Sequence, residues 1–194
     1  SYNKNSTVVD IFNQKNRTSE EWLNKFFYEG NCLCHPSVLI EKSCYDELGL
    51  YDNRFRQLPD FDIWIRFCKK YSLHVLPEKL VKFRLLSDNK NTSSPTISNQ
   101  LRDKNERRFI MQSFFNNMEI STFKKAFSKK LENKNFTTSD EFEIEKALLY
   151  LGTTHSMIGL ENLFLLLGRQ EFIRPLKENY GITDTEFHNL SQKR

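Results

Sequence analysis

The chain has 194 residues, of which 38% are hydrophobic and 13% aromatic, and its 17 Phe can fill a sizeable core, which argues against wholesale disorder. The net charge of +4 is spread thinly and no basic run exceeds a few residues, so a dedicated nucleic-acid-binding protein is not favoured. No apolar run approaches the ~20 residues of a membrane-spanning helix, and the polar start is unlike a secretory signal.

The first 93 residues are predicted to combine short helices with short strands. Thr18 or Ser19 can cap a helix over residues 20–28, because a hydroxyl accepts from the free N–H groups of a first turn. Residues 31–40 are predicted as a strand region bent at Pro36, which cannot donate to a ladder. The other predicted elements are a helix over 44–48 capped by Ser43 and ended by Gly49, a helix that starts at Asp60, and strands over 73–76 and 80–83.

Helices alone are predicted for the second half of the chain. The polar stretch 87–98 is typical of a loop and indicates a boundary near Ser93. The helices expected after it cover about 96–117, 121–131, 139–151, 157–167, 171–180 and 183–191, with Gly181 as a stop and Thr183 as a cap. The sequence therefore predicts an α+β, mainly helical protein in two parts, residues 1–93 and residues 94–194.

The four cysteines are predicted to be free thiols in a reducing compartment. Cys32, Cys34 and His35 are too closely spaced for a tetrahedral zinc site, and no second ligand pair completes one. Cys44 and Cys68 stand alone.

Two carboxylates, Asp60 and Asp62, lie at the start of an amphipathic helix that carries Ile63, Trp64 and Phe67. Acidic residues at a helix start commonly cap its free N–H groups, and Arg66 is then a surface residue. The alternative is that Asp60 acts as a general base, because a carboxylate held on a helix start can be placed accurately against a substrate. The residues alone leave both interpretations open.

Five short segments follow one another between Gly30 and Arg84. They are Gly30-Asn31, His35-Pro36-Ser37, Glu47-Leu48-Gly49-Leu50-Tyr51-Asp52, Pro59-Asp60-Phe61-Asp62-Ile63-Trp64-Ile65-Arg66, and Pro77-Glu78-Lys79-Leu80-Val81-Lys82-Phe83-Arg84. In this order they resemble the acceptor side of family-2 glycosyltransferases of the bacterial capsule and lipopolysaccharide type, and the resemblance covers residues 20–93.

The resemblance implies an inverting sugar transfer from a nucleotide-sugar donor to a glycan or lipid-linked acceptor of a bacterial surface polysaccharide. It makes Asp60 the general base, and it places the acceptor against His35, Asp62, Trp64, Arg66 and Arg84. It implies the acceptor half of a GT-A fold, with short strands, working in the cytoplasm or at the inner face of the membrane. Nucleic acid is not an expected partner.

The donor-binding half of such an enzyme is not recognised in this sequence. No Gly-rich phosphate loop is present, and Asp60-Phe61-Asp62 fits the base motif better than the metal-binding Asp-x-Asp of that half. The resemblance therefore implies Mg²⁺ or Mn²⁺ for the full-length enzyme, no metal held by these residues, and no transferase activity from this part alone. The chain does not begin with Met, which suggests a part of a longer protein.

The helical half matches no motif. Its basic, aromatic stretch over residues 124–134 is either a solvated face or a peripheral contact with an anionic membrane.

Two departures from the family pattern, Pro59 in place of Glu and Leu86 in place of His, favour an alternative function. In that alternative the chain is a non-catalytic helical module for protein interaction.

Overall fold

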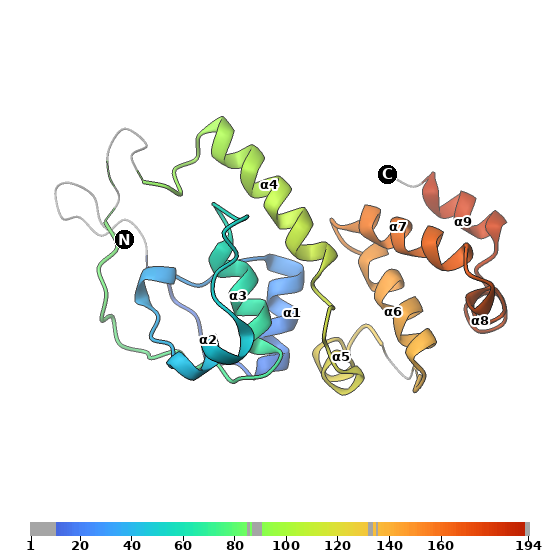
Figure 1. Cartoon of the computed structure of the whole chain (residues 1–194), viewed down its shortest axis with the longest axis horizontal. Coiled ribbons are helices and arrows are strands. Elements are labelled where there is room, and N and C mark those ends of the chain that lie inside the picture. The colour runs from blue at the N-terminus through green and yellow to red at the C-terminus, as the bar shows by residue number, and fades with distance from the viewer. Residues whose placement is uncertain (1–10, 85, 87–90, 132–133, 135, 193–194) are drawn as a thin grey trace. The chain divides into compact units, whose positions relative to one another are not determined.

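The computed structural model describes residues 11–84, 86, 91–131, 134 and 136–192, and it is mainly helical (Figure 1). The chain divides into two compact units between Asn116 and Asn117. The first unit contains α1 (Ser19–Glu29), the 3-10 helix η1 (His35–Ser37), α2 (Lys42–Leu48), α3 (Pro59–Cys68) and α4 (Ile97–Gln112). The second contains α5 (Ile120–Ala126), α6 (Ser139–Leu151), α7 (Ser156–Leu167), α8 (Gln170–Tyr180) and α9 (Asp184–Ser191).

The helix ends follow the predicted capping chemistry at most positions. Thr18 caps α1 in a reciprocal pair with Glu21, and Thr183 caps α9 by accepting from the Glu186 N–H. Gly49 and Gly181 end α2 and α8 with positive φ, which glycine adopts at little cost. The predicted Ser43 cap is wrong, because α2 already begins at Lys42 and has no side-chain cap.

The predicted strands are wrong for the described residues, which form no sheet. Residues 35–37 form η1, and the segments 38–41 and 73–83 are loops without a ladder. A strand needs a neighbouring strand to pair its N–H and C=O groups, and the described chain provides none. Instead, the Val75 N–H donates to the Asn16 Oδ1 at 2.5 Å, and the Val75 carbonyl oxygen accepts from the Asn16 Nδ2 at 2.9 Å. Leu39, Leu80 and Val81 stay exposed.

The core of the first unit lies between α1 and α3, which run side by side (Figure 1). Trp22 stacks on Phe26 with ring centroids 5.6 Å apart, and Phe26 meets Phe61 edge to face at 5.9 Å. Aromatic pairs of this kind stabilise beyond their area burial. This packing holds α3, and with it Asp60, on a rigid support.

Helix α4 belongs to the first unit, so the division at residue 116 differs from the predicted boundary near Ser93. Its buried Glu106 bonds the loop before α3, and Phe114 and Phe115, just after it, lie 5.2 and 5.3 Å from the Phe27 ring. The change in composition near Ser93 marks where predicted strands stop, whereas the compact unit is set by these contacts far apart in sequence.

The second unit is built on the close pair α6 and α7. Gly159 of α7 lies directly against the backbone of α6, where an added Cβ would meet the Ala147 carbonyl oxygen at 2.7 Å. The apolar core around this pair also takes residues from α8 and from the turn after it; it contains Ile144, Ala147, Leu163, Leu166, Phe172, Leu176 and Ile182.

Candidate functional site

The start of α3 presents the two carboxylates singled out in the sequence. Pro59 occupies the first helical turn, where its missing N–H costs nothing, and Asp60 and Asp62 lie in the same turn at the positive end of the helix. Trp64 follows on the buried face, at 2% exposure. The helix therefore fixes the backbone of both carboxylates.

Asp60 is half-buried and its two oxygens are held separately. Oδ2 accepts from the side-chain amide of Asn31 at 2.9 Å, and Oδ1 accepts from the Phe61 N–H at 2.9 Å. A carboxylate offers about four lone-pair sites, so each oxygen keeps room for another donor. The pair of bonds sets the orientation of Asp60 and leaves lone pairs for a further hydrogen-bond donor.

Asn31 is the residue that sequence reasoning missed here. Besides its bond to Asp60, its Oδ1 accepts from the Leu33 N–H at 3.2 Å, which fixes the amide orientation. Its position in the Gly30-Asn31 segment was the available signal, but spacing alone does not show that a residue 29 positions before Asp60 touches it.

Asp62 and Arg66 form an ion pair one helical turn apart, with Nε and Oδ2 2.9 Å from each other. The rest of the Arg66 guanidinium donates to the carbonyl oxygens of Leu48 at 2.5 Å and Leu50 at 2.9 Å. These bonds tie α3 to the loop after α2. Arg66 thus has a clear structural role, and the contact of Asp62 and Arg66 with an acceptor stays a prediction.

His35, Tyr51 and Tyr45 form a hydrogen-bonded chain beside α3. The His35 Nε2 lies 2.9 Å from the Tyr51 hydroxyl, which lies 3.1 Å from that of Tyr45. The His35 ring also lies 6.0 Å from the Trp64 ring. Burial raises the pKa of Tyr51 well above its usual range, with the Tyr45 hydrogen bond and the Asp60 charge adding to the rise. Tyr51 therefore stays protonated near neutral pH.

An open hollow of about 430 Å³ lies over this chain of residues. Aromatic and aliphatic side chains make most of its wall, and the His35 ring and two phenol groups supply polar atoms. Ligand sites commonly combine such apolar walls with a few polar groups. The lining residues are His35, Pro36, Val38, Leu39, Ile40, Tyr45 and Tyr51.

Arg84 lies beyond α3 in the segment that leads towards α4. Its carbonyl oxygen accepts from the Asn91 side chain at 3.1 Å, and its side chain is exposed. Its predicted place at the acceptor site stays a prediction.

The two carboxylates at the start of α3 do not form a cation site together, because Asp62 is paired with the Arg66 guanidinium. Within the described ranges, no group of three or more His, Cys, Asp and Glu residues is arranged to hold a metal. All four cysteines are free, and burial raises the pKa of Cys32 and brings that of Cys68 to about 12, so both remain thiols near neutral pH.

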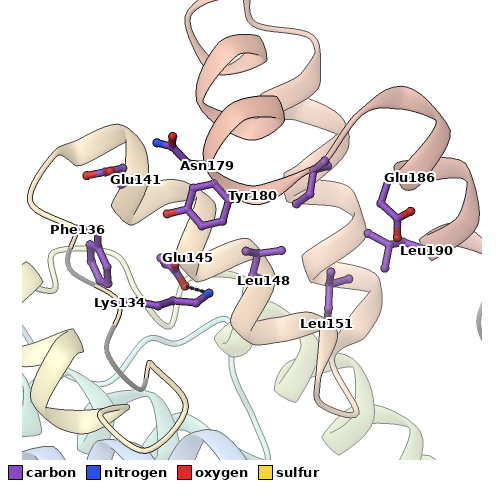
Figure 2. Close-up of a pocket in the computed structure, with 11 residues that line it drawn as sticks. Lys134, Phe136, Glu141, Glu145, Leu148, Leu151, Asn179, Tyr180, Glu186 and Leu190 are labelled. Carbon is purple, nitrogen blue, oxygen red and sulfur yellow. Dashed lines mark hydrogen bonds and ion pairs between the residues drawn. The ribbon is translucent and has the colours of Figure 1, made fainter.

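A second hollow, of about 530 Å³, lies in the helical unit and was not anticipated (Figure 2). Its floor holds Glu145, 2% exposed, which is paired with Lys134 at 3.0 Å. Burial raises the pKa of the adjacent Tyr180, and the Glu145 charge adds to the rise. The charge pair satisfies the buried carboxylate. The lining residues are Lys134, Phe136, Glu141, Glu145, Leu148, Leu151, Asn179, Tyr180, Ile182, Glu186 and Leu190.

The aromatic residues within and beside the basic stretch belong to the core of the second unit. Phe123 and Phe127 are fully buried and Phe136 is 2% exposed, with the Lys124 ammonium 4.5 Å from its ring. A membrane contact by this stretch would therefore depend on charges such as Lys129 and Lys130, without aromatic insertion. In the part of the chain that is described, no helix has the length and apolar character needed to cross a bilayer.

The chain has no significant match among protein-family models, curated proteins or solved structures.

Proposed function

We propose that this chain is the acceptor-side part of an inverting, nucleotide-sugar-dependent glycosyltransferase that builds a bacterial surface glycan, with Asp60 as the general base. The observation that carries the proposal is the geometry of Asp60. It sits on a rigid helix start and is oriented by bonds from Asn31 and the Phe61 N–H, with lone pairs left for another donor. The five ordered segments that resemble family-2 glycosyltransferases support the same conclusion.

In the proposed reaction, an acceptor hydroxyl lies within hydrogen-bond reach of a free lone pair of Asp60. Asp60 takes the hydroxyl proton as that oxygen attacks the anomeric carbon of the donor. The new C–O bond forms as the bond to the nucleoside diphosphate breaks, so the leaving group carries away the electron pair and the configuration inverts. The bonds from Asn31 and the Phe61 N–H keep the base aligned during the transfer.

The hollow is the proposed site of the acceptor sugar. His35 and Tyr51 offer hydrogen bonds to its hydroxyls, and the Trp64 ring lies 6.0 Å from the His35 ring. Asp62 and Arg66 hold the loop that carries Tyr51. Mg²⁺ or Mn²⁺ belongs in this proposal to the donor side, and the step at Asp60 uses the chain's own residues. The proposed location is the cytoplasm, at the inner face of the membrane where the acceptor is lipid-linked.

The test is Asp60→Asn in the intact protein, including any chain that precedes Ser1. Transfer should fall by at least about 10²-fold, the contribution expected of a general base, while donor binding stays within about twofold. Asp46→Asn is the matched control, because Asp46 is an exposed acid paired with Lys42 on α2. Transfer rates and donor affinity are measured for both variants. Retained turnover in Asp60→Asn would overturn the proposal.

A non-catalytic interaction module is the second candidate. One observation favours it: Met157, Phe164 and Leu165 of α7 are 59%, 66% and 64% exposed, which is unusual for large apolar residues on one helix. Under this function Asp60→Asn would leave glycan production in cells unchanged, whereas charged substitutions at Phe164 and Leu165 would abolish it. The opposite pattern supports the transferase.

A further inference from the structure

We propose that Glu106, on α4, is a positioning residue for Asp60. It holds the turn from which α3 starts. This inference rests on the proposed function, because it takes Asp60 as the base. Glu106 lies outside every segment of the resemblance, in the half that the sequence marked as a helical tail.

Glu106 is 5% exposed, and its carboxylate accepts three backbone hydrogen bonds. Oε1 accepts from the Arg56 N–H at 2.9 Å, and Oε2 accepts from the N–H groups of Gln57 at 2.8 Å and Leu58 at 2.9 Å. Three successive backbone N–H groups facing one anion form a concave anion site, and hydrogen bonds to a charged acceptor are stronger than neutral ones. The carboxylate therefore fixes the path of residues 56–58.

That path decides where α3 begins. Leu58 is the N-cap residue of α3, and its side chain makes no capping bond. Glu106 accepts the N–H of this N-cap residue from another helix, the role that a Glu at the third helical position plays in a capping box. Asp60 follows two residues later, so a shift of this turn moves the base relative to Asn31. A displacement of about 1 Å at a reacting group can cost about 10²-fold in rate.

The neighbouring Arg107 brings α4 against the partners of Asp60 as well. Its guanidinium lies 5.7 Å from the Phe61 ring and packs directly on Gly30, the residue before Asn31. Gly30 has a φ of +83°, and a Cβ there would overlap the guanidinium. Helix α4 therefore contacts the segment on each side of the Asn31–Asp60 bond, which is the arrangement expected of a support for that bond.

The experiment compares Glu106→Gln with Glu145→Gln in the intact protein. Both substitutions remove one buried carboxylate, but Glu145 lies in the helical unit and pairs with Lys134. At a temperature where both variants are folded, Glu106→Gln should lower kcat about 10–100-fold, leave the donor KM within about twofold, and speed hydrogen exchange at residues 56–58. Glu145→Gln should lower Tm and leave kcat within about twofold.

Unchanged kcat in folded Glu106→Gln would overturn the positioning role. If that variant does not fold, Glu106→Asp replaces it, because Asp keeps the charge but is one methylene shorter. Unchanged kcat in Glu106→Asp would also overturn the positioning role. Slow exchange of amides 56–58 in the unmodified protein is expected in either case, and fast exchange contradicts the inference. If Asp60→Asn loses activity and Glu106→Gln keeps it, this inference alone is refuted. If Asp60→Asn keeps its activity, the proposed function is refuted.

Discussion

Replacing Gly159 by Ala should destabilise the helical unit, although the same change usually stabilises a helix. In an exposed helix interior, Gly→Ala gains about 1 kcal/mol of propensity. Here the new methyl would lie 2.7 Å from the Ala147 carbonyl oxygen and 2.9 Å from the Leu151 nitrogen. Both contacts are to backbone, so they are relieved only by moving α6 away from α7. Such overpacking costs about 1–3 kcal/mol.

The helix separation also loosens the core around Ile144 and Leu163, which are fully buried. We therefore expect Gly159→Ala to lower the free energy of unfolding by about 1–2 kcal/mol and Tm by about 4–16 °C, since a unit of this size shifts by about 4–8 °C per kcal/mol. Gly168→Ala is the matched control. Its Cβ would meet the nearest backbone oxygen at 3.5 Å, an ordinary contact.

Calorimetry is the assay, because it follows each cooperative unfolding transition of a chain with two compact units. Gly168→Ala should leave the transition of the helical unit within about 1 °C. A Gly159→Ala protein that unfolds at or above the temperature of the unmodified chain would refute the packing argument.

Two further predictions concern the first unit. Asn31→Ala should lower kcat about tenfold, because it frees the Asp60 carboxylate to rotate. The control is Asn53→Ala, in an exposed turn, which should leave kcat unchanged. Equal kcat values in steady-state assays of the two variants would contradict the orienting role of Asn31. Burial lowers the pKa of Lys69 from 10.5 to about 8. The folded state therefore loses this proton at a lower pH than the unfolded state, and the free energy of unfolding rises as pH increases between these two values. Between pH 8 and 9, denaturant titration should show the unmodified protein gaining about 1 kcal/mol relative to Lys69→Met, and parallel pH profiles would show that Lys69 is not the cause.

Much of the local structure was predictable from short-range chemistry. The caps Thr18 and Thr183 and the stops Gly49 and Gly181 act within one helical turn, so their residue types suffice. The buried faces of α1 and α3 follow from helical spacing of aromatic residues. The predicted strands failed because strand formation depends on a partner segment, and extended apolar sequence alone does not provide one.

The candidate site shows the same division. The sequence alone determined that Asp60 starts a helix and that Trp64 faces the core, since both follow from positions along α3. Only the tertiary structure decided that Asn31 holds Asp60, that His35 joins Tyr51, and that Glu106 binds residues 56–58. Those bonds join residues 16 to 50 positions apart. At such separations the sequence does not say which side chains will meet. The packing of α1, α3 and α4 selects them.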